Sequence, residues 1–543
     1  MSGESTQSSL LSTTSLSTNI TPNSYGLLIQ SNLNSQIASI QFDADTGWLA
    51  IAGNANNNIV KQTITGNGYY QFDIDGTIFS SNRSSSAFWQ SLDGATSTSV
   101  VGINFDGGLG DDTLIVGSQE YNQGFGVIAD DTIQIQGAVQ SESVFLKAKD
   151  IINQGEITAG NVTAEFSNSY TDEAEAKITT INGGSILLNG GETGDLEITG
   201  KFFATGATGG KIDVRGKTVS LRGANLDASG ENGGGTILVG GDYRGADPTG
   251  LGILVNAQFA FVDKYSIINA NALTSGDGGK VIIWADADTD FRGNINARGG
   301  IETGDGGFVE VSGRQNLNFV GKVDVGAKNG KNGSILLDPT NIIVNADDDD
   351  DSTFDISNLQ NMRGNVTLSA TNNIVFNTEG YFFIPTGTIT LEAGNSVILT
   401  QDFETGGRNL NISGAFINAM GRISSYAKSG SAIGKSGNIR LTSRGGIEIN
   451  DVATSDLDVG NAGNITLEAS TFISAGLLTT SSNGNSGNVR LSANGDISSS
   501  DISTYSTGSG VSGNVNILGR SDSSKPNSIA VGLINTSGLF HLK

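Results

Sequence analysis

Short stretches of alternating apolar and polar residues, separated by Gly, Ser and Asn, recur along most of this chain. An alternation with a period of two predicts β-strands that bury one face. The pattern is most regular in the last third, where a Gly-Asn-[Ile/Val]-x-[Leu/Ile] pentapeptide begins at Gly437, Gly463, Gly487 and Gly513, at intervals of 26, 24 and 26 residues. A fixed period in this range is typical of a solenoid in which each repeat is one turn of the chain. We therefore expect an all-β protein, a right-handed parallel β-helix (β-solenoid) with coils of about 25 residues.

The same strand pattern extends towards the amino terminus. Related strands follow the glycine pairs 183–184, 209–210, 234–235, 278–279 and 306–307. Shorter apolar stretches between them indicate three strands per coil. The gap of 44 residues from Gly235 to Gly279 contains an insertion around Asp242 to Lys264, which we expect to form a loop on one face of the stack.

The departures from this pattern divide the chain into five ranges. They are a Ser/Thr-rich tail (1–24) expected to be disordered, a β-rich amino-terminal module (25–130), a solenoid (131–345), an acidic insertion with a short helix carrying Leu359 and Met362 (346–364), and a solenoid continuation (365–543). Residues 25–130 lack the repeat, so two interpretations stay open for them. They form either a separate antiparallel module or an irregular start of the solenoid.

The four asparagines of the pentapeptides, Asn438, Asn464, Asn488 and Asn514, occupy equivalent positions. Their amides could bond to one another from coil to coil, as side-chain ladders do in cross-β structures. Alternatively, each Gly-Asn pair forms a corner, because both residues tolerate a positive φ. Either role is structural.

Composition removes several classes of function. The formal net charge of −25 repels the phosphates of nucleic acids. The chain has no cysteine and one histidine, His541, which excludes disulfides, thiolate metal sites and Ser-His-Asp or Cys-His catalysis. No apolar stretch approaches the roughly 18 residues that span a bilayer, so we expect no membrane span. The first 24 residues show no basic start and no apolar core, so we expect no signal peptide there.

Calcium is the metal for which the sequence offers candidate ligands. Residues 107–115 match the Gly-Gly-x-Gly-x-Asp-x-apolar-x nonapeptide of haemolysin-type calcium-binding repeats. Loop carbonyls with Asp111 and Asp112 would supply the oxygen ligands that calcium prefers. A plain Gly/Asp turn is the alternative, since no second copy follows. The acidic run Asp347–Asp351 is a second place for calcium, or else a solvated loop.

Asp286, Asp288 and Asp290 alternate, so on a strand they would share one face. Glycosidases use paired carboxylates, but a solvent-facing strand edge explains the same spacing. Because the chain lacks the Asn-Thr-Asp, Gly-His-Gly and Arg-Ile-Lys motifs of polygalacturonase-type enzymes, we expect it not to be an enzyme.

The segment 276–300, GDGGKVIIWADADTDFRGNINARGG, together with GGTILVGGDYRG at 234–245, resembles the filamentous-haemagglutinin-like exoproteins of Gram-negative bacteria. The resemblance covers residues 180–345 most specifically. It implies a secreted right-handed β-helix that acts as an adhesin or surface filament. It also implies a location outside the cell or on its outer surface, cell-surface or extracellular glycans or proteins as partners, and export by an outer-membrane translocator. Two alternatives are a polysaccharide lyase or hydrolase on the same fold, and a calcium-dependent surface-layer component.

Overall fold

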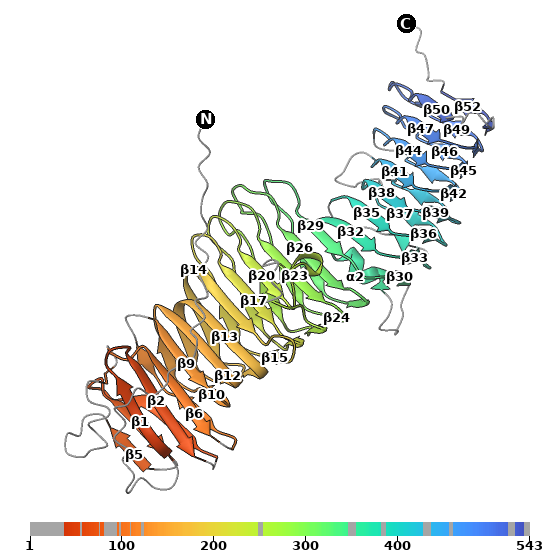
Figure 1. Ribbon diagram of the computed structural model, residues 1–543. Helices are drawn as coiled ribbons and strands as arrows, with labels where there is room; N and C mark the ends of the chain where they lie inside the picture. Colours follow the sequence, from red (N-terminus) through yellow and green to blue (C-terminus); the bar gives the residue numbers. More distant parts are fainter. Residues whose placement is uncertain are drawn as a thin grey trace, which may run out of the picture.

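The chain forms an elongated stack of short β-strands, which Figure 1 shows as rungs running from the red amino-terminal end to the blue carboxyl-terminal end. The computed structural model describes residues 37–536, apart from 55–56, 75–76, 81–94, 97–98, 109, 121–123, 248–253, 346–353, 379, 382–386, 427–435, 455–459 and 520–526. The predicted disordered tail (1–24) and the acidic run (347–351) therefore lie outside the described residues. The described residues are nearly all β, and the strands run in long parallel sheets. The predicted all-β, solenoid-like fold is confirmed.

Three columns of strands make up the stack, and the first column is continuous along it. The long strands β12, β13 and β14 turn corners and so join all three columns of the amino-terminal part into one 36-stranded sheet. The first column contains β2 (Trp48–Asn54), β6 (Gly102–Gly108), β9 (Phe125–Ala129), β12 (Ser143–Asn153), β13 (Glu156–Asp172), β14 (Lys177–Asn189), β17 (Lys211–Arg215), β20 (Thr236–Val239), β23 (Lys280–Ala285), β26 (Phe308–Gly313), β29 (Ser334–Leu337), β32 (Asn365–Ala370), β35 (Ile389–Ala393), β38 (Leu410–Gly414), β41 (Ile439–Ser443), β44 (Ile465–Ala469), β47 (Val489–Ala493) and β50 (Val515–Gly519).

The second column begins within the 36-stranded sheet and continues as a separate nine-stranded sheet. Its first part contains β3 (Ile59–Ile64), β7 (Thr113–Val116), β10 (Thr132–Ile135), β15 (Asp195–Ile198), β18 (Thr218–Leu221), β21 (Phe259–Val262), β24 (Asp288–Phe291) and β27 (Asn316–Phe319). The nine-stranded sheet contains β30 (Ile342–Asn345), β31 (Phe354–Asp355), β33 (Ile374–Phe376), β36 (Ser396–Leu399), β39 (Phe416–Ala419), β42 (Ile447–Ile449), β45 (Ile473–Ala475), β48 (Ile497–Ser499) and β51 (Ile529–Val531).

The third column is divided in the same way, with a seven-stranded sheet at the carboxyl-terminal end. Its first part contains β8 (Gln119–Glu120), β11 (Ala138–Gln140), β16 (Lys201–Phe203), β19 (Asn225–Asp227), β22 (Ile267–Asn269), β25 (Asn294–Asn296) and β28 (Lys322–Asp324). The seven-stranded sheet contains β34 (Gly380–Tyr381), β37 (Phe403–Glu404), β40 (Ile423–Ser424), β43 (Val452–Ala453), β46 (Leu478–Thr479), β49 (Ile502–Ser503) and β52 (Ile534–Asn535).

Antiparallel strands occur at the amino-terminal end. Strand β1 (Ile37–Asp43) pairs with β2, and β4 (Tyr70–Ile74) pairs with β3 and with β5 (Thr77–Ser80), all antiparallel. Strands β2 and β3 also pair in parallel with β6 and β7. The parallel stack therefore begins within the range 25–130, and the antiparallel strands are added to its first rungs.

The core is a set of apolar columns that follow the axis of the stack. The pentapeptide residues Ile439, Ile465, Val489 and Val515 pair in exact register on adjacent strands. The first three are buried, and Val515 is partly buried because it lies on the last described strand of its column. Burying an Ile or Val side chain contributes about 1.5–3 kcal/mol, so the repeated column stabilises each coil against its neighbours.

The Gly-Asn pairs form a ladder rather than positive-φ corners. The Oδ1 of Asn438 accepts hydrogen bonds from the backbone N–H (2.8 Å) and the side-chain amide (3.0 Å) of Asn464. The Oδ1 of Asn464 accepts the same two bonds from Asn488. None of the four asparagines, all of which are described, has a positive φ. The glycines are needed for a different reason. A Cβ on Gly463 would lie 2.1 Å from the carbonyl oxygen of Gly437 on the adjacent coil.

The coil after β30 carries the short helix α2 (Ile356–Gln360). Asp355 is its N-cap and accepts a hydrogen bond from the N–H of Ser357 at 2.7 Å. The helix is shorter than expected, since it carries Leu359 but ends before Met362. Both side chains are fully buried, so the helix and the residues after it are anchored to the core. The first column continues past this coil through β29 and β32, whereas the other two columns begin new sheets there.

The predicted insertion around Asp242 to Lys264 is shorter than expected, because Phe259–Val262 form β21 and pair with β18 and β24 in the second column. It contains the 3-10 turn η1 (Tyr243–Gly245). We call its described parts, residues 240–247 and 254–258, the strap. The strap lies over the outward face of the first column, where Tyr243 packs edge-on against Phe308 with 5.7 Å between ring centroids. Leu238, Ile282 and Trp284 point outward there and are nevertheless buried.

Candidate functional site

The predicted calcium nonapeptide lies where β6 meets β7. Asp111 is exposed and Asp112 is buried, and Leu109 of the motif lies outside the described residues. The Oδ1 of Asp112 accepts a hydrogen bond from the backbone N–H of Asn58 at 2.6 Å, and its own N–H donates to Asp131 at 3.3 Å. Asp112 therefore connects neighbouring segments of the stack.

The electrostatics at Asp112 are those of a crowded acidic cluster. Burial raises the pKa of Asp112, and the nearby carboxylates of Asp130, Asp131 and Asp111 raise it further, while the Asn58 N–H opposes the shift. The Oδ2 of Asp112 is buried and accepts no hydrogen bond. Among the described residues, no three His, Cys, Asp or Glu side chains are arranged to hold a metal ion. Calcium at Asp111 and Asp112 stays a prediction.

We expect calcium to raise the melting temperature only slightly, and only through the amino-terminal third. Neutralising repelling carboxylates favours the folded state by mass action. Far-UV circular dichroism with calcium or chelator measures this in the parent and in Asp111→Asn/Asp112→Asn, which should lose the shift. A collapse of the whole β signal on chelation would contradict the expectation.

The alternating aspartates near β24 each have a separate partner. Asp286 accepts a bond from the indole N–H of Trp284 (3.0 Å) and pairs with Arg314 (3.1 Å). Asp288 accepts from the amide of Asn316 (2.7 Å), and Asp290 pairs with its neighbour Arg292 (2.9 Å). Asp288 and Asp290 share the outer side of β24, as predicted from their spacing, and Asp286 precedes the strand. Asp286 and Asp288 therefore link successive coils through Arg314 and Asn316, and Asp290 does so by accepting a further bond from the amide of Asn318 at 3.2 Å.

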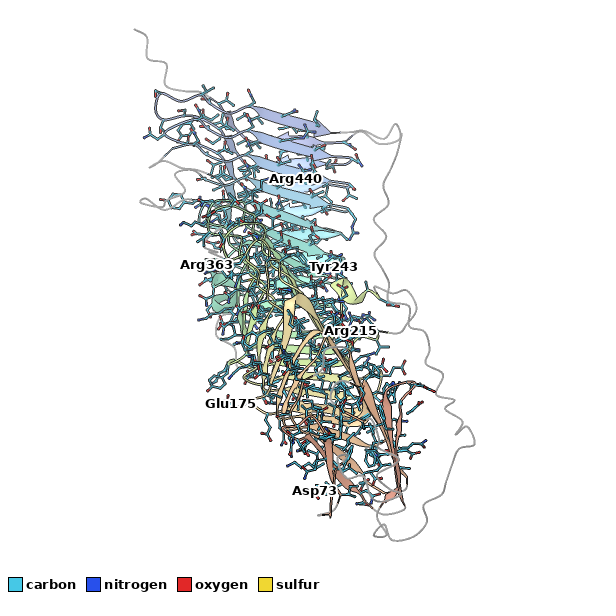
Figure 2. The ribbon with its side chains drawn as sticks, turned by 90° about the vertical axis from the view of Figure 1, so that its left-hand side faces the viewer. Asp73, Glu175, Arg215, Tyr243, Arg363 and Arg440 are labelled. Carbon is cyan, nitrogen blue, oxygen red and sulfur yellow. The ribbon has the colours of Figure 1, made fainter. Side chains whose placement is uncertain are left out.

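The pattern of alternating residues did not predict the charged groups under the strap. Asp213 and Arg215 point outward on β17, yet both are buried, and they pair at 2.7 Å. Glu310 on β26 is also fully buried, and its carboxylate accepts the backbone N–H of Arg244 at 3.2 Å. Figure 2 shows Arg215 and Tyr243 in the same region of the rod. A feature that could have indicated burial is the apolar outward position of Leu238 and Ile282 between them.

Burial raises the pKa of Glu310 to about 7. Hydrogen bonds from the backbone of Arg244 and the side chain of Ser312 act in the opposite direction, and the carboxylate of Asp338 adds a smaller rise. The folded protein thus holds a proton that the unfolded chain loses near its ordinary pKa of 4.5. The contribution of Glu310 to stability is complete below that pH and is lost as the pH rises through about 7.

We expect the backbone amides of the strap to be less protected from hydrogen exchange at pH 8 than at pH 6. Glu310→Gln, which keeps an acceptor without a charge, should remove most of this difference and stabilise the strap at pH 8 by about 1–3 kcal/mol. The measurement is exchange of the 240–247 peptide, corrected for intrinsic rates. A local readout is required because burial also raises the pKa of Asp172 to about 7 in a distant coil. The exposed Glu302→Gln is the control, and identical pH profiles for parent and Glu310→Gln would contradict the prediction.

A polar groove occurs on the third column, beside α2. We call it the α2 groove; its volume is about 520 Å³. This is within the range of about 300–1,000 Å³ that is typical of ligand sites. Figure 2 shows Arg363, which lines it, on the side of the rod away from Tyr243 of the strap. The groove is lined by Ile267, Asn294, Ile295, Asn296, Lys322, Val323, Asp324, Gln360, Asn361 and Arg363.

A second hollow, of about 570 Å³, continues the α2 groove along the same column. Asn296 in the α2 groove donates to Asn269 in the second hollow at 3.0 Å. The two hollows together therefore follow the axis over several coils. The second hollow is lined by Thr205, Gly206, Asp227, Ser229, Glu231, Asn269, Asn271 and Leu273.

No protein-family model matches this chain, and no curated protein matches it. Among the described residues, no helix is both long and apolar enough to cross a membrane.

Proposed function

We propose that this chain is a right-handed parallel β-helix with coils of about 25 residues that serves as a structural or adhesive exoprotein. It attaches to cell-surface or extracellular glycans or proteins and catalyses no reaction. Its place is outside the cell or on the outer surface of a Gram-negative-type bacterium, and an outer-membrane translocator exports it. The resemblance of residues 180–345 to filamentous-haemagglutinin-like exoproteins supports each of these points.

The observation that carries the proposal is the in-register repetition of polar groups on the outside of the stack. The outward Asn438, Asn464 and Asn488 are exposed and lie on successive coils. Adjacent strands in a sheet are about 4.8 Å apart, so such columns present the same chemistry many times along one line. Weak equivalent contacts on one molecule add through effective concentration, which is how a long repetitive surface attaches firmly.

A panel of immobilised glycans, assayed for both protein retention and new reducing ends, tests the proposal. We expect retention on some glycans or on whole cells, without new reducing ends. Reducing ends produced by the parent and lost in Asp286→Asn/Asp288→Asn would overturn it in favour of a glycosidase or lyase. Failure to bind any glycan, protein or cell surface would overturn it as well.

A further inference from the structure

We propose that the α2 groove binds an anionic saccharide, through Lys322 and Arg363. This inference rests on the proposed attachment function and assigns it to one place on the rod. The groove is the point where α2 interrupts the regular outward face of the third column, so its lining includes Gln360, Asn361 and Arg363 from the helix and the residues after it.

The charge of the α2 groove is opposite to that of the protein. The whole chain carries −25, whereas Lys322 and Arg363 both line the groove, are exposed, and have no ion-pair partner among the described residues. The carboxylate of Asp324 is already bound by Arg298 at 2.5 and 2.9 Å. The groove therefore keeps two uncompensated positive charges, and these favour an anion.

The position of the two cations is set by strand pairing. Lys322 pairs with Asn294 in the ladder between β25 and β28, and Arg363 forms a bridge with Asp324 on the next rung. The backbone N–H of Arg363 donates to Val323 at 3.0 Å, which holds the residue on the column. Lys322 and Arg363 therefore belong to neighbouring rungs, so one anionic group lying across the rungs can meet both.

The rest of the lining fits a polyhydroxylated ligand better than an apolar one. The amides of Asn294, Asn296 and Asn361 supply both donors and acceptors, and Ile267, 42% exposed, offers an apolar contact for a sugar ring. The guanidinium of Arg363 donates hydrogen bonds, and charge-assisted bonds from a guanidinium to a carboxylate are strong and directional. The continuation into the second hollow lets a chain of sugars extend along the axis, with its neutral residues beside Asp227 and Glu231.

The test measures binding of polyuronate oligomers to the full chain, with the methyl-esterified oligomers as the uncharged counterpart. We expect the parent to bind the acid form and to lose most of this affinity as salt rises. Lys322→Gln/Arg363→Gln should bind at least about tenfold more weakly, because two charge-assisted contacts are removed. The control Lys147→Gln/Lys177→Gln removes the same charge from a distant, exposed part of the stack and should bind like the parent.

The outcomes separate the two proposals. Equal binding by the parent and the groove variant, or parent binding to the esterified oligomer that matches the acid form, overturns the α2 groove as an anion site and leaves the attachment function standing. Absence of binding to every glycan, protein and cell surface overturns both. Circular dichroism of each variant confirms that the β signal is retained.

Discussion

Ile465→Asp should destabilise the carboxyl-terminal coils by more than about 4 kcal/mol. The side chain of Ile465 is fully buried and lies in register between Ile439 and Val489. Substitution removes the burial of an apolar side chain and places a carboxylate among aliphatic groups that cannot pair with it. In a stack of coils each unit is stabilised mainly by its neighbours, so the damage should be concentrated around β41, β44 and β47.

Two measurements check this prediction. Urea denaturation followed by circular dichroism should show a lower midpoint or a new early transition. Hydrogen exchange should show lost protection in residues 439–493 with little change in residues 177–345. Thr466→Asp, on the partly exposed side of the same strand, is the control. If the urea midpoints of Ile465→Asp and the parent coincide, Ile465 does not belong to the core.

Arg215→Met should destabilise the region under the strap by about 3–5 kcal/mol. Arg215 is completely buried and binds Asp213 through its Nε at 2.7 Å and its Nη2 at 3.4 Å. Asp213 is 1% exposed, so after the substitution it keeps only the ion pair with Lys211 at 3.0 Å. Because Lys211 is half-exposed, its ion pair offsets only part of the cost of keeping the Asp213 charge away from water.

Adding a second substitution that removes the charge of Asp213 should restore most of the stability lost in Arg215→Met. Asp213→Leu/Arg215→Met replaces the pair with apolar groups, which is often neutral for stability. The half-exposed pair of Arg222 and Glu197 supplies the control, because Arg222→Met should change stability by no more than about 1 kcal/mol. Equal destabilisation by Arg215→Met and Arg222→Met would contradict the buried role of Arg215. Thermal unfolding and exchange of residues 211–215 are the readouts.

The acidic residues show how one residue type can be interpreted differently from sequence and from structure. Asp111 and Asp112 belong to a segment that matches a calcium-binding nonapeptide, which predicts them as metal ligands. In the fold Asp112 binds the N–H of Asn58, 54 residues earlier in the chain. Glu310, in contrast, belongs to no motif, yet its pKa is raised to about 7 by burial. A motif records short-range spacing, whereas burial of a carboxylate depends on which segment covers it.

The amino-acid sequence is enough to predict the strands, the residues that point inward and the alignment of successive coils. Alternation separates the two faces of a strand, and a regular interval between pentapeptides allows only one register in which Ile439, Ile465 and Val489 stack. It also limited the Gly-Asn pairs to two structural roles. The three-dimensional structure distinguishes the ladder from the corner, because a hydrogen bond between Asn438 and Asn464 requires the two coils to lie side by side.

Burial and charge pairing on the outward faces of the strands depend on long-range contacts that the sequence pattern does not show. Whether an outward position is polar or apolar depends on the residues that surround it on the surface. The alternation along one strand does not show that an inserted segment covers these positions. Arg244 meets Glu310 across 66 residues of sequence, and Arg363 meets Asp324 only because the chain forms α2 and then rejoins the third column. The buried charges under the strap and the basic α2 groove both arise from such long-range returns of the chain, which no spacing within a single coil encodes.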